Sequence, residues 1–345
     1  MRTFRCHCGN TLFFENTRCL SCGRELGYLP EQGLLSALEP LGNEAWLALS
    51  GDLFRQHYRK CANYVHEGVC NWMIPVETSH NWCPACRLNQ TIPNLAEPNA
   101  RLYWSRLEMA KRRLLYTLIQ LGLPITPKLD DPEHGLAFAF LADSDSGLLN
   151  GSYPERIATG HHDGVITINL AEADDAHRET IRQQMMEPYR TLLGHFRHES
   201  GHYFWEQLLQ GPSRSRFREL FGDERTPYPE ALQRYYAKGA PPDWQSRYIS
   251  AYASSHPWED WAESWAHYLL IQDTLESAAD AGIARFEGLN FAQRIQEWST
   301  TSTVINALNR SMGLNDAWPF VLSPAAVEKL AFVESVIRRP ATVAN

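Results

Sequence analysis

Apolar residues recur at roughly helical spacing over residues 101–121, which predicts one long helix. Gly122 follows this segment and acts as a stop signal. From residue 136 the pattern changes to a continuous apolar run over residues 136–141, which predicts a strand. The chain therefore combines helices with at least one sheet.

A β-hairpin is expected after this strand. Residues 156–159 and 165–170 have strand character, and Asp163-Gly164 between them is typical of a tight turn. His161 and His162 are expected in the turn as solvated side chains rather than as metal ligands. The strand over residues 165–170 is expected to offer an edge for an extended substrate.

The remaining pattern is mostly helical. A helix capped near Asp174 or Asp175 is followed by one over residues 188–209, which Pro188 opens, and Ser323-Pro324 opens a last helix. Strands thus precede a mainly helical C-terminal lobe, so the expected fold class is α+β.

The composition fits a folded protein. The chain has 345 residues, of which 44% are hydrophobic and 21% are charged, so it is not a disordered chain. Its longest apolar runs are far too short to span a bilayer. The N-terminal residues Met1 to Cys6 contain no apolar signal core. We therefore expect a cytoplasmic location and no membrane association.

All eight cysteines lie within the first 86 residues. They form two sets of four, Cys6, Cys8, Cys19 and Cys22, then Cys61, Cys70, Cys83 and Cys86. Two thiolates separated by one or two residues in a tight turn can bind one ion, and two such turns complete a tetrahedral zinc site. Both sites would be structural, because four thiolates leave no open position. Buried free thiols and redox sensing are the alternatives.

The cysteines divide the chain into two expected domains. Residues 1–95 would form a zinc-ribbon region and residues 100–345 a second domain, with the boundary near residues 95–100. Residues 1–95 hold eight acidic and eight basic residues, so the net charge of −8 comes from the rest of the chain. This neutral balance argues against nucleic acid as a partner, since phosphate contacts need Lys and Arg. Recognition of a protein partner by the zinc ribbons remains open.

The segment His198-Glu199-Ser200-Gly201-His202 is an H-E-x-x-H motif on the helix expected over residues 188–209. Positions i and i+4 share one helix face, so His198 and His202 can bind one zinc ion. Glu199 points to the side, where it can reach a metal-bound water and act as its base. A histidine-rich surface helix is the alternative, although chance gives this motif only roughly 0.03 times in such a chain.

His195 complicates this motif. It lies seven residues before His202, which is about 10.5 Å along a helix axis, so the two cannot readily share an ion. His195 is therefore expected to pack in the core, to support the ligands or to face the substrate. Trp205 and Leu208 stand where metzincins place glycine and histidine, which excludes that class.

A catalytic zinc needs a third protein ligand, and the best candidate lies on a helix that Pro257 opens. Glu259, Glu263 and His267 line one face of that helix at i, i+4 and i+8. Glu259 can bind zinc while Glu263 orients a ligand histidine. A solvated acidic face is the alternative, which the tryptophans among these acids weaken.

The combination of H-E-x-x-H with E-x-x-x-E on a second helix is similar to the gluzincin metallopeptidases. Tyr252 stands seven residues before Glu259, which begins Glu-Asp-Trp-Ala-Glu, and this segment resembles anthrax lethal factor and the Mlc titration factor peptidases. The resemblance implies that Tyr252 assists catalysis and that Glu259 is the third ligand. Together with the N-terminal cysteines, the whole chain resembles a bacterial family of zinc-binding metallopeptidases with an N-terminal zinc ribbon. It implies a zincin-like domain with a small sheet, an active-site helix and a helical second lobe.

The leading functional hypothesis is zinc-dependent hydrolysis of peptide bonds. Zinc would polarise the scissile carbonyl and bind the attacking water, Glu199 would accept its proton, and Tyr252 would donate to the oxyanion. The implied cofactors are one catalytic and two structural zinc ions, and the implied partner is a peptide or protein substrate. One alternative is a zinc-ribbon binding or regulatory module with an inactive or sensory H-E-x-x-H domain. Another is a metal hydrolase that acts on a non-peptide amide.

Overall fold

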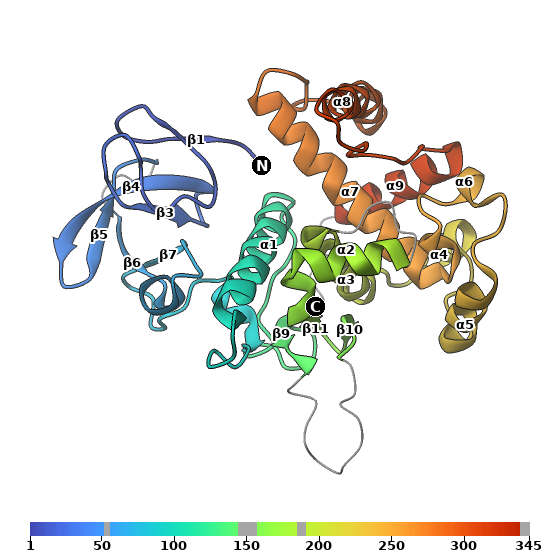
Figure 1. Cartoon of the computed structure of the whole chain (residues 1–345), viewed down its shortest axis with the longest axis horizontal. Coiled ribbons are helices and arrows are strands. Elements are labelled where there is room, and N and C mark those ends of the chain that lie inside the picture. The colour runs from blue at the N-terminus through green and yellow to red at the C-terminus, as the bar shows by residue number, and fades with distance from the viewer. Residues whose placement is uncertain (52–55, 144–156, 185–190, 339–345) are drawn as a thin grey trace, which may run out of the picture. The chain divides into compact units, whose positions relative to one another are not determined.

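The computed structural model describes residues 1–51, 56–143, 157–184 and 191–338 (Figure 1). The chain forms two compact units, Met1–Ile181 and Arg182–Asn345. Every strand in the described ranges belongs to the first unit, whereas the described part of the second unit consists of helices and their connections. This arrangement confirms the expected α+β class with a mainly helical C-terminal portion.

Two antiparallel elements form the N-terminal part of the first unit. A hairpin pairs β1 (Phe4–Arg5) with β2 (Thr11–Leu12). A five-stranded sheet follows chain order, with β3 (Leu26–Leu29), β4 (Leu34–Gly42), β5 (Ala45–Ala48), β6 (His57–Lys60) and β7 (Met73–Pro75). Its core contains Leu29, Leu38, Ala48, Tyr58 and Met73. Cys61 directly follows β6 and precedes the π-helix η1 (Asn63–Glu67). The 3₁₀-helix η2 (Cys86–Leu88) follows β7, so regular elements flank the second cysteine set.

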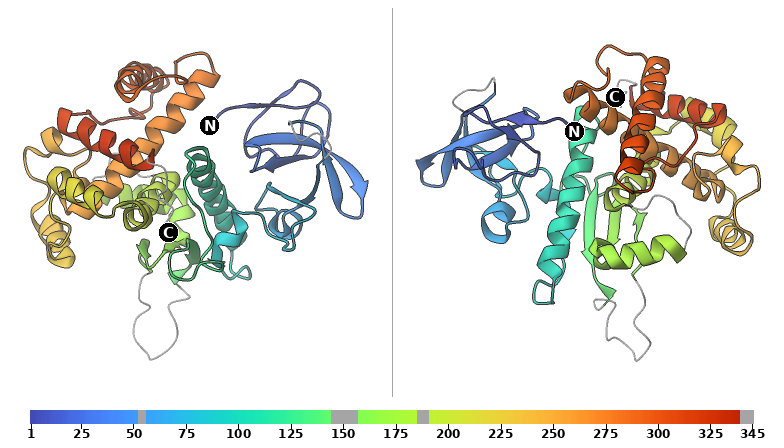
Figure 2. Two further views of the ribbon diagram at one scale, coloured as in Figure 1. Left: turned by 180° about the vertical axis from the view of Figure 1, so that it is seen from behind. Right: turned by 45° about the horizontal axis from the view of Figure 1, so that its top comes forward.

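A second sheet and a long helix complete the first unit. The sheet has the order β10 (Gly160–His162), β11 (Val165–Asn169), β9 (Ala137–Leu141) and β8 (Asn89–Thr91). Helix α1 (Ala100–Gln120) lies beside it (Figure 2), with the buried Lys111 ammonium over the Phe138 and Phe140 rings and 2.9 Å from Glu108. Strand β8 precedes the expected boundary at residues 95–100, and β9 follows it. The division into domains at that boundary therefore stays a prediction.

The hairpin differs from the expected one. Asp163 and Gly164 make the turn with φ angles of 46° and 72°, and positive φ at both central residues is typical of a two-residue hairpin turn. Such a tight turn continues the ladder up to the turn, so His161 and His162 lie in β10 rather than in the turn. The prediction of a strand over residues 156–159 is wrong for Ile157–Thr159, which are irregular. Residue 156 lies outside the described residues. Strand β11 pairs with β10 and β9, so it offers no free edge.

After β11 the chain is helical. The 3₁₀-helix η4 (Leu170–Ala173) leads into α2 (Asp175–Gln184), and Asp174 accepts from the backbone of Ala176 and His177 as expected for a cap. The second unit then contains α3 (Leu192–Leu208), α4 (Pro212–Phe221), α5 (Tyr228–Lys238), α6 (Trp244–Arg247), η5 (Tyr252–Ser254), α7 (Pro257–Asp280), α8 (Phe291–Ser311) and α9 (Pro324–Ile337). Thr191 caps α3, while Pro188, the expected start, lies outside the described residues.

Helix α7 is the centre of the second unit. It contacts α3, η5, α8 and α9. Buried ion pairs join these helices: Arg197 to Asp273, Asp260 to Lys329, and Arg294 to Glu334. Among the helices of the described residues, none has the length and apolar character needed to cross a membrane.

Candidate metal centre and active site

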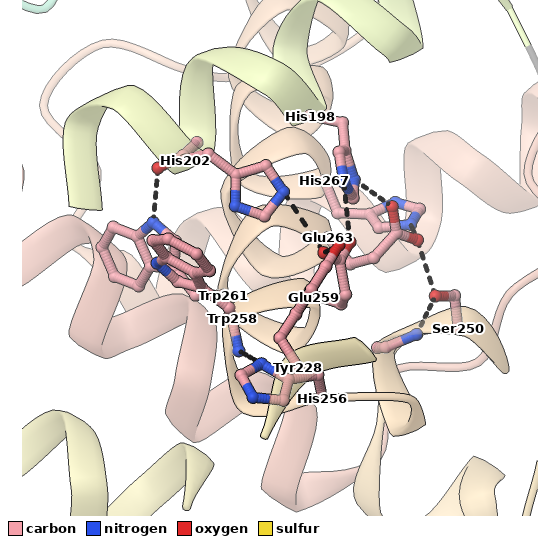
Figure 3. A network of polar contacts seen from close by, with 12 residues as sticks. His198, His202, Tyr228, Ser250, His256, Trp258, Glu259, Trp261, Glu263 and His267 are labelled. Atoms are coloured by element: carbon pink, nitrogen blue, oxygen red, sulfur yellow. Dashed lines mark hydrogen bonds and ion pairs between the residues drawn. The ribbon is translucent and has the colours of Figure 1, made fainter. Parts of the chain in front are cut away.

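Helices α3 and α7 pack closely, and their contact carries the candidate site (Figure 3). Gly201 permits this approach, because a Cβ atom there would lie 2.9 Å from the Cα atom of Ala262. The indole Nε1 atom of Trp261 donates to the Gly201 carbonyl at 2.8 Å, and that of Trp265 donates to Ser200 Oγ at 3.1 Å. The tryptophans between the acids of α7 thus fix the turn of α3 that separates its two motif histidines.

His198, His202 and Glu259 converge at this contact. One ligand atom of each lies within 4.8 Å of the others. Glu259 Oε2 lies 3.0 Å from His198 Nε2, and Glu259 Oε1 lies 3.5 Å from His202 Nε2. Zinc bonds of 2.0–2.2 Å in a tetrahedron give ligand separations of about 3.3–3.6 Å, so the donor set fits this ion. Glu259 is 1% exposed, so the alternative of a solvated acidic face is wrong at this position.

Glu263 contacts the other side of the His198 ring. Its Oε1 accepts from His198 Nδ1 at 2.7 Å, and its Oε2 accepts from Ser250 Oγ at 2.6 Å. A carboxylate only accepts hydrogen bonds, so Glu263 accepts from a proton on Nδ1, and this proton stays in place when a metal ion takes the position of the proton on Nε2. The Nε2 lone pair of His198 is then available to a metal, which is the arrangement that orients metal-binding histidines.

The two carboxylates give this site a negative field. Burial lowers the pKa of His198, but Glu259 and Glu263 outweigh burial and raise this pKa well above its usual value. Burial raises the pKa of Glu263, yet the contact with His198 lowers it to about 2. The pKa of Glu259 is lowered well below its usual value by His202 and His198, against the effect of burial. Both acids are therefore ionised near neutral pH and attract a cation.

Glu199 lies next to His198 on α3 but does not belong to the ligand group. It is half-buried, and burial raises its pKa against the opposing attraction of His198 and His202. A carboxyl group with a raised pKa beside a metal site is suited to accept and release a proton near neutral pH.

Two tyrosines reach the cluster from other elements. Tyr252 on η5 packs against His198, with ring centroids 5.9 Å apart, and burial raises the pKa of its hydroxyl well above its ordinary value. Tyr228, the first residue of α5, donates from its hydroxyl to Glu259 Oε1 at 2.7 Å. No sequence pattern indicates Tyr228, because it is 31 residues from Glu259 and belongs to no motif. Ser250 was missed for the same reason.

His195 and His267 lie outside the ligand group. His195 is half-buried on α3, three residues before His198. His267 is buried on α7, with its Nε2 3.9 Å from Glu263 Oε2 and its ring against Trp318 and Phe320. Burial lowers the pKa of His267 to about 4, so it is neutral at pH 7.

The first cysteine set forms one cluster. Its four Sγ atoms lie within 4.8 Å of one another, and the Cys6–Cys22 and Cys8–Cys19 pairs are each separated by 3.7 Å. Zinc–sulfur bonds of about 2.3 Å give about 3.8 Å between sulfurs in a tetrahedron, so these distances fit zinc. The backbone of Arg24 hydrogen-bonds Cys22 and lowers its pKa to about 6. This favours the thiolate, which is the form that binds metals.

The second cysteine set is wholly buried. Its members Cys61, Cys70, Cys83 and Cys86 form a cluster, and the Sγ atoms of Cys70 and Cys83 are 3.7 Å apart. Arg112 of α1 is buried beside this cluster and donates to the Val69 carbonyl. Burial lowers the pKa of Arg112, but the negative charges of Cys70 and Glu108 raise it above its ordinary value. The guanidinium would thus offset part of the charge that four thiolates carry when they bind zinc.

The fold and these clusters define an α+β protein with an N-terminal zinc-ribbon region and a histidine–glutamate site in its helical part. A family model for a zinc-ribbon domain matches residues 3–97. The family model described as "Putative zinc-binding metallo-peptidase" matches residues 100–336. The chain belongs to this metallo-peptidase family, as the resemblance of its motifs indicated.

Relatives match over nearly the whole chain. Uncharacterized proteins from Mycobacterium tuberculosis and Mycobacterium bovis are each 42% identical over 349 residues, which cover 98% of this chain and 95% of each relative. No solved structure matches this chain.

Proposed function

We propose that this protein is a zinc-dependent metallopeptidase of the gluzincin type that hydrolyses peptide or protein substrates. The observation that carries the proposal is the convergence of His198, His202 and Glu259 beside Glu199. Two imidazoles and one carboxylate are a ligand set of catalytic zinc sites, which keep a further position open for the reaction. Membership of a metallo-peptidase family supports the same chemistry.

The proposed zinc content is one catalytic and two structural ions. His198, His202 and Glu259 would hold the catalytic ion, and each four-cysteine cluster would hold one structural ion. When bound, catalytic zinc supplies a Lewis acid that polarises the scissile carbonyl and makes a nucleophile available at neutral pH. The cysteine clusters support a reducing compartment, and the cytoplasm is the proposed location.

Glu199 is the proposed general base. It would take a proton from the attacking water and pass it to the leaving amine, so one carboxyl group serves both transfers. The raised pKa of Glu199, caused first by burial, supports this role because the protonated form then becomes accessible during the reaction.

Tyr252 is the proposed donor to the developing oxyanion. Burial raises the pKa of its hydroxyl, so the hydroxyl keeps its proton and can donate. Its ring packs against His198, one of the proposed zinc ligands, which supports a role at this site.

Substitution of Glu199 by glutamine tests this proposal. Glu199→Gln keeps size and hydrogen-bonding reach but cannot accept the proton, so it should keep all zinc and lose about 10²–10⁴ in activity. His202→Ala should lose both the catalytic zinc and activity, because two remaining ligands hold the ion poorly. Substrates come from an unbiased peptide-library digest, and zinc is measured by elemental analysis. Wild-type activity in Glu199→Gln on a verified substrate would refute the mechanism.

A second candidate function is recognition of a protein partner by the zinc-ribbon region. Leu20 is 95% exposed between Cys19 and Cys22, and Phe13 is 60% exposed. Leu20 lies on the turn between two proposed zinc ligands, where an exposed apolar side chain can contact a partner. Leu20→Ser should weaken binding of a protein substrate or partner and leave hydrolysis of short peptides unchanged. Equal loss for short peptides and proteins would argue against a recognition role.

A further inference from the structure

A tyrosine from a third helix contacts the one carboxylate of the proposed ligand group (Figure 3). The Tyr228 hydroxyl donates to Glu259 Oε1 at 2.7 Å. Glu259 Oε1 also lies 3.5 Å from His202 Nε2, while Oε2 lies 3.0 Å from His198 Nε2. The two oxygens therefore differ. Oε1 accepts a hydrogen bond from the tyrosine hydroxyl, whereas Oε2 contacts the His198 ring and no hydroxyl in these interactions.

His256 anchors both ends of this hydrogen bond. Its Nδ1 accepts from the Trp258 backbone at 3.1 Å as the cap of α7, so its Nε2 carries the proton and donates to the Thr226 carbonyl at 3.0 Å. Thr226 lies two residues before Tyr228, and Glu259 lies three residues after His256. One side chain thus ties the backbone next to the tyrosine to the helix turn that carries the glutamate.

Ring contacts hold the tyrosine in place. The Tyr228 ring meets the His256 ring at a centroid distance of 5.1 Å and the Trp258 ring at 6.1 Å, both nearly perpendicular. Trp258 in turn contacts the His202 ring at 5.6 Å. The hydroxyl is therefore directed at Glu259 by packing that does not depend on the hydrogen bond itself.

The direction of the hydrogen bond is also fixed. A tyrosine hydroxyl keeps its proton near neutral pH, because its ordinary pKa is about 10. The carboxylate of Glu259 has no proton to give as a metal ligand and can only accept. Near neutral pH the hydroxyl is thus always the donor and the carboxylate always the acceptor.

We propose that Tyr228 is a positioning residue that holds the carboxylate of Glu259 with Oε2 presented to the metal. This inference rests on the zinc site of the proposed function. It adds to that site a residue that fixes the third ligand before the ion arrives. Partners that orient metal ligands typically contribute 10–100-fold in metal affinity.

Removal of the hydroxyl alone tests this role. Tyr228→Phe keeps the ring against His256 and Trp258. In the full-length zinc-loaded protein, chelator competition should show the dissociation constant of the non-cysteine zinc ion raised about 10- to 100-fold. Tyr252→Phe is the matched control, since it removes a buried hydroxyl whose ring contacts His198 rather than the carboxylate. Its zinc dissociation constant should equal that of the wild type.

The outcomes separate this inference from the function on which it rests. Tight zinc binding by the wild type and an equal dissociation constant for Tyr228→Phe would overturn the role of Tyr228 and leave the metal site standing. A wild type without zinc beyond the cysteine-bound ions would overturn the site and the inference together. Melting of protein stripped of the non-cysteine zinc gives a further readout. A lower melting temperature of the stripped Tyr228→Phe protein together with unchanged zinc affinity would show a structural role only and contradict the positioning role.

Discussion

His198 Nδ1 lies 2.7 Å from Glu263 Oε1, and this contact sets which ring nitrogen faces Glu259. Glu263→Ala removes the acceptor, so the imidazole loses its preferred tautomer and orientation. Zinc affinity at the proposed catalytic site should fall about 10- to 100-fold, and Glu263→Gln, which keeps an acceptor oxygen, should lose less. Competition with a fluorescent chelator measures both.

The control for Glu263 removes an acid elsewhere. Glu328→Gln deletes one negative charge from an ion pair with Arg216, both of which are about half exposed or more. Its zinc affinity should match the wild type. If Glu328→Gln and Glu263→Gln lose the same affinity, general charge rather than orientation of His198 explains the effect.

Zinc content and the order of zinc release form the second prediction. Native protein should contain three zinc ions per chain, one for each cluster of potential ligands. Mild chelation should remove one ion first, because a three-ligand open site releases metal more readily than a closed four-thiolate site. Elemental analysis and thiol titration follow the loss. Undamaged protein with at most one zinc would contradict two structural sites, and thiols that react before activity is lost would contradict the order.

The helices of the site were predictable because their signals are local. The i, i+4 spacing places His198 and His202 on one face of α3, and the same spacing places Glu259 and Glu263 on α7. Pro257 marks the start of α7, since proline suits the first turn. Each of these features depends only on residues that are a few positions apart in the sequence.

Tyr228 and Ser250 could not be predicted in this way. Their contacts with Glu259 and Glu263 span 31 and 13 residues and arise from packing of separate elements. The five-stranded sheet was not predicted either, because strands such as β5 and β7 have four and three residues and carry too short a pattern to recognise. The hairpin start was misplaced because a two-residue turn at Asp163 and Gly164 draws His161 and His162 into the ladder.

Arg112 provides the third prediction. A buried zinc ion with four thiolates carries a net negative charge, and the Arg112 guanidinium beside Cys70 offsets it. Arg112→Met should therefore speed zinc loss from Cys61, Cys70, Cys83 and Cys86, while the first cysteine cluster keeps its rate. Mass spectrometry of thiol labelling during chelation distinguishes the two clusters in one sample.

Another arginine of α1 serves as the control for Arg112. Arg106 pairs with Asp175 and the Ala173 carbonyl, and no cysteine is among these partners. Arg106→Met should leave labelling of both clusters unchanged. Equal acceleration at both clusters in Arg112→Met would show general destabilisation of the unit instead of charge compensation.

Gly201 provides the fourth prediction. A methyl group at this position meets backbone 2.9 Å away at Ala262, and overpacking of this kind costs about 1–3 kcal/mol. Alanine regains roughly 1 kcal/mol of helix propensity, so the net loss should be at most about 2 kcal/mol. Gly160→Ala is the control, because a Cβ atom there meets nothing within 4 Å. Urea unfolding measures both. A Gly201→Ala protein about 1 kcal/mol more stable than the wild type, the gain that helix propensity alone would give, would contradict close packing of α3 on α7.

The pH dependence of stability provides the last prediction, through His267. Burial lowers the pKa of His267 from 6.5 to about 4 in the folded protein. Between these values the unfolded chain binds a proton that the folded protein does not, so stability present above pH 6.5 is lost as the pH falls. From pH 7 to pH 5 this group alone should lower the free energy of unfolding by about 2 kcal/mol. His267→Phe keeps a ring against Trp318 and Phe320 but cannot titrate. The difference between wild type and variant in urea unfolding cancels effects common to both, including zinc release. The free energy of unfolding of the variant minus that of the wild type should be larger at pH 5 than at pH 7. A difference that does not change with pH would show that His267 is not held neutral by burial.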